Sequence, residues 1–136
     1  MKRLTILGST GSIGQSALDI VSMHPDRFQV SCLTGARNID LLARQVAVFR
    51  PLLVSVLDKD GALALSRKID GPHKPEIVYG EAGFIEAAEH PAADTALLAM
   101  VGAAGLAPAL AAIEAGKQIA LANKETLVMA GDIVMA

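Results

Sequence analysis

Three glycines spaced three residues apart follow a short apolar segment near the start of the chain, and no other feature constrains the fold as much. The segment is Leu4–Leu7, and the glycines are Gly8, Gly11 and Gly14. Apolar residues then recur at helical spacing over residues 13–21. A strand, a glycine turn and a helix in this order are typical of a dinucleotide-binding βαβ unit. An ordinary strand-to-helix turn is the alternative.

Each glycine has a predicted role in such a unit. Gly8 can adopt backbone angles that a side chain forbids. Gly11 lacks the Cβ atom that would block a pyrophosphate, and Gly14 allows the helix to pack closely on the strand. The spacing differs from the commoner Gly-x-Gly-x-x-Gly pattern, so the strand before the glycines and the helix after them carry the interpretation.

The segment after the second predicted strand indicates which dinucleotide binds. Residues 28–34 form this strand, and no acidic residue follows it before Asp40. An NAD site usually has a carboxylate there, which binds the ribose 2′-hydroxyl. Arg37 instead offers a planar, permanently charged group to a 2′-phosphate, and Asn38 can cap the next helix and donate an amide N–H. The sequence therefore favours NADP over NAD, with a solvated Arg37 as the alternative.

The composition suits a sheet buried on both faces and argues against several other functions. Of the 136 residues, 52% are hydrophobic and only 3% aromatic, so Ala, Val, Leu and Ile fill the core. The net charge is −2, with no basic cluster among aromatics, so we expect no nucleic-acid partner. No run approaches the roughly 18 apolar residues of a membrane helix. Cys32 is the single cysteine, and we expect it to be buried and inert. Since the sequence also shows no secretory leader, it predicts a cytoplasmic protein.

Strands and helices alternate along the chain, which predicts one α/β domain over residues 1–136. We expect a doubly wound, mostly parallel Rossmann-type sheet with helices on both faces. The predicted strands are 4–7, 28–34, 53–57, 77–79, 95–101 and 119–122, and the predicted helices are 12–21, 39–49, 59–68, 83–89 and one that has Pro108 in its first turn and ends near Ala115. The strand over 95–101 is expected to lie beside the first strand.

Ligands of such sheets bind beyond the carboxyl ends of the strands, where the strand order reverses. Four segments are expected to meet there: 8–14, 35–38, 99–105 and 123–126. The first two are predicted to bind the pyrophosphate and the adenosine ribose, and the other two to lie near the nicotinamide. The polar residues 123–125 interrupt an apolar run, and a plain helix start is their alternative interpretation.

Four motifs, in order along the whole chain, together resemble one enzyme family. They are Gly8–Gly14, Gly35–Asn38, Val101–Gly105 and Leu121–Val128. The chain resembles the amino-terminal part of the 1-deoxy-D-xylulose 5-phosphate reductoisomerases. Those enzymes rearrange and reduce a sugar phosphate with NADPH and a divalent metal (Mg or Mn) in the non-mevalonate route to isoprenoid precursors. The Ala-Asn-Lys-Glu sequence at 122–125 is the most specific of the motifs.

The resemblance implies roles for individual residues. The residues implied to bind NADPH are Thr10, Gly11, Ser12 and Ile13 at the pyrophosphate, Gly35, Ala36, Arg37 and Asn38 at the adenosine ribose and its 2′-phosphate, and also Asn123 and Glu125. Lys124 is implied to contact the substrate. The resemblance implies no catalytic residue and no metal ligand in this chain, because the family carries these in a later domain, and it implies a homodimer. We expect the 136-residue chain to be a truncated form that binds NADPH without turning over substrate.

Other classes fit the residues less well. Extended short-chain reductases need a Tyr with a Lys four residues later, but Tyr79 is followed at that spacing by Gly83. An NADP-dependent semialdehyde dehydrogenase needs a reactive cysteine. A nucleotide-sensing module needs no catalytic residue. Both classes stay as alternatives. His24, His73 and His90 each adjoin a proline and lack metal-ligand spacing, so we expect them to be surface turn residues.

Overall fold

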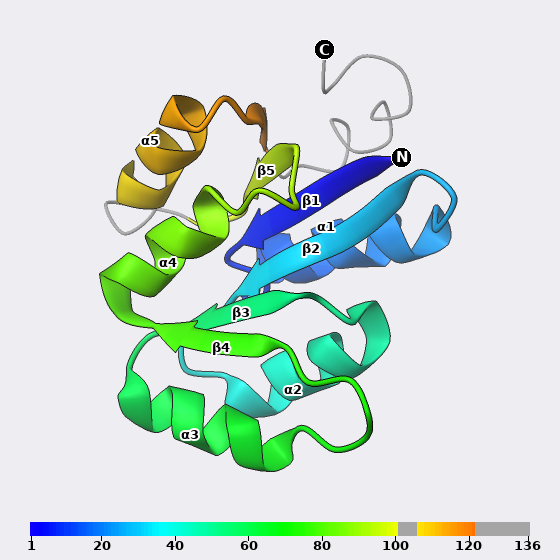
Figure 1. Ribbon diagram of the computed structural model, residues 1–136. Helices are drawn as coiled ribbons and strands as arrows, with labels where there is room; N and C mark the ends of the chain where they lie inside the picture. The colour runs from blue at the N-terminus through cyan, green and yellow to red at the C-terminus, as the bar shows by residue number, and fades with distance from the viewer. Residues whose placement is uncertain (101–105, 122–136) are drawn as a thin grey trace.

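Parallel strands form one six-stranded sheet in the computed structural model, which describes residues 1–100 and 106–121 (Figure 1). The strands are β1 (Lys2–Leu7), β2 (Phe28–Thr34), β3 (Leu53–Val56), β4 (Glu76–Tyr79), β5 (Thr95–Leu98) and β6 (Gln118–Leu121). The helices are α1 (Ser12–Met23), α2 (Ile39–Phe49), α3 (Lys59–Lys68), α4 (Gly80–Ala88) and α5 (Leu106–Glu114).

The strand order is β4-β3-β2-β1-β5-β6, and every pair is parallel. The chain begins in the middle of the sheet, builds outward to β4, and then crosses back to place β5 on the free side of β1. The strand order therefore reverses between β1 and β5, where a parallel α/β sheet binds its ligand. The predicted doubly wound sheet is confirmed, and so is the place of β5 beside β1.

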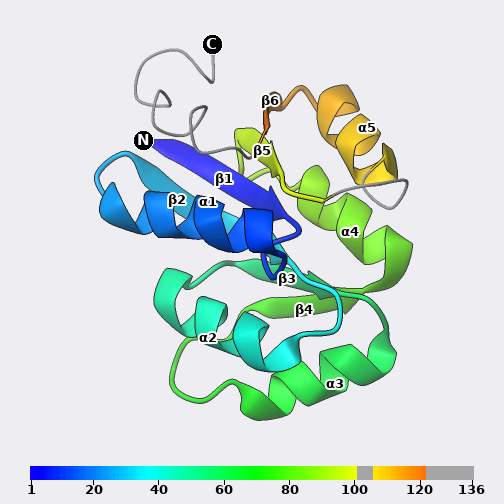
Figure 2. The ribbon, with the colours of Figure 1, turned by 180° about the vertical axis from the view of Figure 1, so that it is seen from behind.

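Helices cover both faces of the sheet, with α1 and α2 on one side and α4 on the other (Figures 1 and 2). The strand residues alternate accordingly: Leu4 and Ile6 belong to the core cluster with α1 and α2, whereas Leu7 packs with Ala88 of α4 and Ala112 of α5. Buried aliphatic side chains fill both layers, as a sheet covered on two faces requires.

Small residues let α4 approach the sheet closely. A Cβ atom added at Gly83 would lie 2.6 Å from the Ser55 hydroxyl of β3, and Ala87 and Ala88 are completely buried. Gly80 has a φ of +76° and so turns the chain from β4 directly into α4. This turn explains why α4 starts at Gly80 rather than at the predicted residue 83.

The remaining predicted elements differ from the structure only at their ends. β3 stops at Val56 because Asp58 caps α3, its carboxylate accepting the Gly61 amide at 2.8 Å. β5 ends at Leu98, so the prediction that this strand continues through Ala99 and Met100 is wrong; these two residues instead lie against Gly8. β6 is described as far as Leu121, and the predicted strand ends at residues 101 and 122 lie outside the described residues. Within residues 1–100 and 106–121, no helix combines the length and the hydropathy needed to span a membrane.

Candidate cofactor site

The glycine turn between β1 and α1 sits at the carboxyl end of the central strand and needs glycine at its first position. Gly8 has a φ of +95°, which L side chains rarely adopt. A Cβ atom there would also lie 2.7 Å from Cγ of Met100 and 3.1 Å from the Ala99 carbonyl oxygen. The end of β5 therefore packs directly against this turn.

The other two glycines have opposite surroundings. A Cβ atom on Gly14 would lie 2.1 Å from the Gly8 carbonyl oxygen and 2.7 Å from Cα of Ser9, so only glycine lets α1 pack here. Among the described residues, a Cβ atom on Gly11 would meet only the Gly8 oxygen, at 4.0 Å. The close packing predicted for Gly14 is confirmed, and the space above Gly11 is compatible with a phosphate group.

The N-terminus of α1 has the features of an anion site. Gly11 is the N-cap, no side chain caps the helix, and its first turn contains no acidic residue. Among the described residues, no hydrogen-bond acceptor takes the amides of Ser12 and Ile13. Gly11, Ser12 and Ile13 are exposed and Thr10 is partly exposed. Free amides and the positive end of the helix dipole thus face solvent together, which favours an anion.

Hydrogen bonds hold the turn from the side of β2 and α2. Oγ1 of Thr34 accepts the Gly8 amide at 2.8 Å, and the Thr34 carbonyl accepts the Ser9 amide at 2.7 Å. The Ser9 hydroxyl and carbonyl both bond the side-chain amide of Gln45, at 2.7 and 2.8 Å. Sequence reasoning missed Thr34 and Gln45. The available signal was that Gln45 interrupts the apolar face of α2, three residues after the buried Leu42.

The loop after β2 lies beside the glycine turn. A Cβ atom on Gly35 would be 3.2 Å from Cγ2 of Thr10, and the Gly35 amide donates to the Ser55 carbonyl at 2.9 Å. Asn38 caps α2 as predicted, its Oδ1 accepting the Leu41 amide at 3.2 Å. The structure thus brings the segment predicted to bind the pyrophosphate, 10–13, and the segment predicted to bind the adenosine ribose, 35–38, to one edge of the sheet.

Arg37 supplies the cationic charge of this loop. Its side chain is exposed, and neither ion pair found among the described residues involves it. Asp40, the first acid after β2, instead meets Nζ of Lys68 at 2.7 Å. That hydrogen bond and charge hold the pKa of Asp40 below its usual range. The carboxylate is therefore already paired with α3, while the Arg37 guanidinium is available to a ligand.

The other candidate residues divide into two groups. Asn123, Lys124 and Glu125 lie outside the described residues. The histidines are partly exposed, and within the described part of the chain no three His, Cys, Asp or Glu residues gather as a metal site. His73 and His90 are more than surface turn residues: Nε2 of His73 donates to the Pro51 carbonyl at 2.7 Å, and Nδ1 of His90 accepts the Ala92 amide at 3.1 Å.

Cys32 is buried in the middle of β2 and does not face the site. Its exposed fraction is 0%, and burial raises the pKa of the thiol to about 12. A reactive cysteine needs an accessible position and a lowered pKa. The prediction that Cys32 is buried is confirmed, and a buried thiol with a raised pKa does not fit the nucleophile of a semialdehyde dehydrogenase.

Comparison with known proteins gives the family. Residues 4–131 match the family model described as 1-deoxy-D-xylulose 5-phosphate reductoisomerase. The chain belongs to this family. The reductoisomerase of Geobacter metallireducens is 62% identical over 135 residues, 99% of this chain and 35% of that protein. The one from Symbiobacterium thermophilum is 53% identical over 138 residues, 99% of this chain and 36% of that protein. The chain thus spans about a third of the length of these curated relatives.

Solved structures agree with the family assignment. A crystal structure of the reductoisomerase in complex with NADPH, fosmidomycin and magnesium superposes with a TM-score of 0.84 at 46% identity, over 98% of this chain and 33% of that one. The Zymomonas mobilis enzyme in complex with NADPH gives a TM-score of 0.81 at 39% identity, over 98% and 35%. Membership in the reductoisomerase family favours that interpretation over a semialdehyde dehydrogenase or a nucleotide-sensing module.

Proposed function

We propose that residues 1–136 form the NADPH-binding Rossmann domain of a 1-deoxy-D-xylulose 5-phosphate reductoisomerase. The observation that carries this proposal is the open N-terminus of α1 beside the Arg37 loop, at the point where the strand order reverses. Free amides bind a pyrophosphate, and an arginine without a neighbouring acid binds a 2′-phosphate. Relatives with the same fold carry NADPH in their crystal structures.

Different residues of the chain bind different parts of the cofactor in this proposal. In this proposal the amides of Thr10, Gly11, Ser12 and Ile13 bind the pyrophosphate, and Gly35, Ala36, Arg37 and Asn38 bind the adenosine ribose and its 2′-phosphate. Asn123 and Glu125 contact the cofactor further along, and Lys124 contacts the substrate. When bound, NADPH supplies a hydride, and the role of this chain is to hold the cofactor in a fixed orientation for its transfer.

The whole protein is proposed to convert 1-deoxy-D-xylulose 5-phosphate to 2-C-methyl-D-erythritol 4-phosphate in the non-mevalonate pathway. A divalent cation takes part, as the magnesium in related crystal structures suggests. Because no metal-ligand group occurs in residues 1–100 and 106–121, we assign the cation and the reacting sugar to residues beyond them. We also propose that the whole protein is a cytoplasmic homodimer.

Cofactor titration tests the binding proposal. We expect the chain to bind NADPH more tightly than NADH, because only NADPH has a 2′-phosphate for Arg37. The variant Arg37→Ala should reduce this preference by about 1.5–3 kcal/mol, the contribution of one hydrogen bond to a charged group. Isothermal titration calorimetry measures both affinities. The matched control is Arg27→Ala, which removes an exposed arginine from the turn after α1 and should leave the preference unchanged.

Two results would contradict this proposal. Equal affinity for NADPH, NADH and ATP in the unmodified chain would indicate a general nucleotide site. Reductoisomerase turnover by the purified 136-residue chain would show that the catalytic groups lie within it, contrary to their assignment to the rest of the protein.

A further inference from the structure

Gln45 of α2 lies buried beneath the glycine turn, and we propose that its side-chain amide positions this turn for the cofactor's pyrophosphate. The inference rests on the proposed cofactor site and adds a residue that contacts no ligand itself. It depends on a pair of hydrogen bonds, on the packing of Ser9, and on the contacts of α2 with both the 2′-phosphate loop (35–38) and the pyrophosphate turn (8–13).

The two hydrogen bonds between Gln45 and Ser9 are reciprocal. Nε2 of Gln45 donates to the Ser9 carbonyl at 2.8 Å, and the Ser9 hydroxyl donates to Oε1 of Gln45 at 2.7 Å. Both residues are buried, with exposed fractions of 0% for Ser9 and 6% for Gln45. The primary amide of glutamine has one donor and one acceptor side by side, and these satisfy the carbonyl and the hydroxyl of Ser9 together.

Helix α1 also packs against Ser9. The position of a Cβ atom on Gly14 lies 2.7 Å from Cα of Ser9 and 2.8 Å from its carbonyl carbon. Ser9 therefore has α1 packed against its main chain and the Gln45 amide bonded to its carbonyl and hydroxyl groups. Thr10, the first of the proposed pyrophosphate-binding residues, follows directly. A displacement of Ser9 would therefore also move the amides that bind the phosphate oxygens. A misplacement of about 1 Å would weaken those hydrogen bonds substantially.

Helix α2 connects the proposed 2′-phosphate loop to the proposed pyrophosphate turn. Asn38 caps its N-terminus, next to Arg37, and Gln45 projects from the same helix two turns later to the glycine turn. The helix thereby sets the position of the 2′-phosphate loop relative to the pyrophosphate turn. Losing Gln45 should affect the pyrophosphate contacts and spare those of the 2′-phosphate, a selective effect that general destabilisation would not produce.

The experiment uses three variants and two ligands. Gln45→Met keeps the length of the side chain and removes both hydrogen bonds, and Ser9→Ala removes only the one from the hydroxyl. Val46→Ala is the matched control, because it creates a cavity at the neighbouring buried position of α2. The ligands are NADPH and adenosine 2′-monophosphate, which lacks the pyrophosphate. Calorimetry gives the dissociation constants, and urea unfolding gives the stability of each variant.

We expect Gln45→Met to weaken NADPH binding by about tenfold or more, and Ser9→Ala to weaken it by less. Both variants should bind adenosine 2′-monophosphate with an affinity within about twofold of the unmodified chain. Val46→Ala should lower stability and leave both affinities within about twofold. The positioning role is overturned if Gln45→Met binds NADPH with unchanged affinity, or if it loses affinity equally for NADPH and for adenosine 2′-monophosphate. If Gln45→Met does not fold, Ser9→Ala decides by the same comparison. Failure of the unmodified chain to bind NADPH would instead overturn the proposed function.

Discussion

Gly11 and Gly14 belong to one turn, yet their surroundings predict different effects of the same substitution. In Gly14→Ala the new methyl group meets the Gly8 oxygen, so we expect a loss of about 1–3 kcal/mol in unfolding free energy together with loss of NADPH binding. Gly11 has a φ of −74°, which any residue can adopt, and among the described residues the methyl group of Gly11→Ala would meet only the Gly8 oxygen, at 4.0 Å. The fold should therefore be unaffected, and only NADPH affinity should fall. Urea unfolding and calorimetry measure the two quantities. A stable, tightly binding Gly14→Ala would contradict the described packing.

Cys32 gives the chain a predictable response to high pH. Its pKa is raised by burial from 9.0 to about 12, so the folded state keeps the proton that the unfolded state releases above pH 9. The thiol's contribution to stability is complete below pH 9 and decreases as the pH rises, by about 1.4 kcal/mol for each pH unit up to 12.

Unfolding of the unmodified chain and of Cys32→Ala between pH 8 and pH 10.5 checks this prediction. The difference between their unfolding free energies should be constant near pH 8 and change in favour of the alanine variant above pH 9. A difference that does not vary with pH would mean that the thiol titrates alike in both states.

At the scale of elements, α2 is capped by a residue, Asn38, that has an observed structural role and a proposed role in cofactor recognition. Asn38 caps the helix through Oδ1, and it also follows Arg37 in the proposed 2′-phosphate loop. Asn38→Asp should preserve helix stability, because a carboxylate is an equally good cap. The new charge should repel the 2′-phosphate and shift the preference from NADPH toward NADH. Thermal unfolding and the ratio of the two dissociation constants measure these effects. A large loss of stability, or an unchanged ratio, would contradict the assignment.

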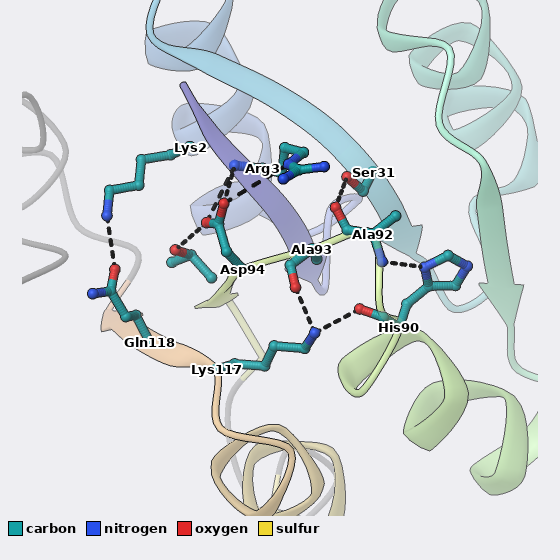
Figure 3. Close-up of polar contacts among 10 residues, drawn as sticks. Lys2, Arg3, Ser31, His90, Ala92, Ala93, Asp94, Lys117 and Gln118 are labelled. Carbon is teal, nitrogen blue, oxygen red and sulfur yellow. Dashed lines mark hydrogen bonds and ion pairs between the residues drawn. The ribbon is translucent and has the colours of Figure 1, made fainter.

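At the scale of the whole molecule, the two ends of the sheet differ in the residues they carry and in their proposed roles. The carboxyl ends of the strands carry the proposed cofactor site, whereas polar contacts join the amino ends of β1, β5 and β6 (Figure 3). Nζ of Lys2 donates to Oε1 of Gln118 at 2.8 Å, and the Arg3 amide donates to the Asp94 carboxylate at 3.2 Å. These contacts connect β1, β5 and β6 across the sheet.

Lys117 is the clearest test of this division. Its ammonium group donates to the carbonyls of His90 and Ala93, which fastens the loop before β5 to the start of β6 (Figure 3). Lys117→Met should lower the unfolding free energy by about 1–3 kcal/mol because two carbonyls lose a charged donor. NADPH affinity should not change, since the site lies at the other end of the strands. Lys74→Met, which replaces an exposed lysine in a loop, serves as the control and should have little effect.

Local patterns in the chain determined most of the fold and the outline of the site. The alternation of apolar strands with helical periodicity predicted the doubly wound sheet, because burial on two faces produces that pattern wherever it occurs. The positive φ of Gly8 and the cap at Asn38 were predictable for the same reason: each depends on the geometry of a few neighbouring residues.

Only the tertiary structure decided what depends on contacts between distant segments. Gln45 reaches Ser9 across 36 positions, and Gly35 comes beside Thr10 because β1 and β2 are paired. The early start of α4 also required the conformation of Gly80 and the close approach of Gly83 to Ser55. A sequence pattern records which face of an element is buried, but the partner on that face follows from how the chain packs. The sequence could therefore predict the amides at the start of α1 and the position of Arg37. It could not predict the buried hydrogen bonds between Gln45 and Ser9.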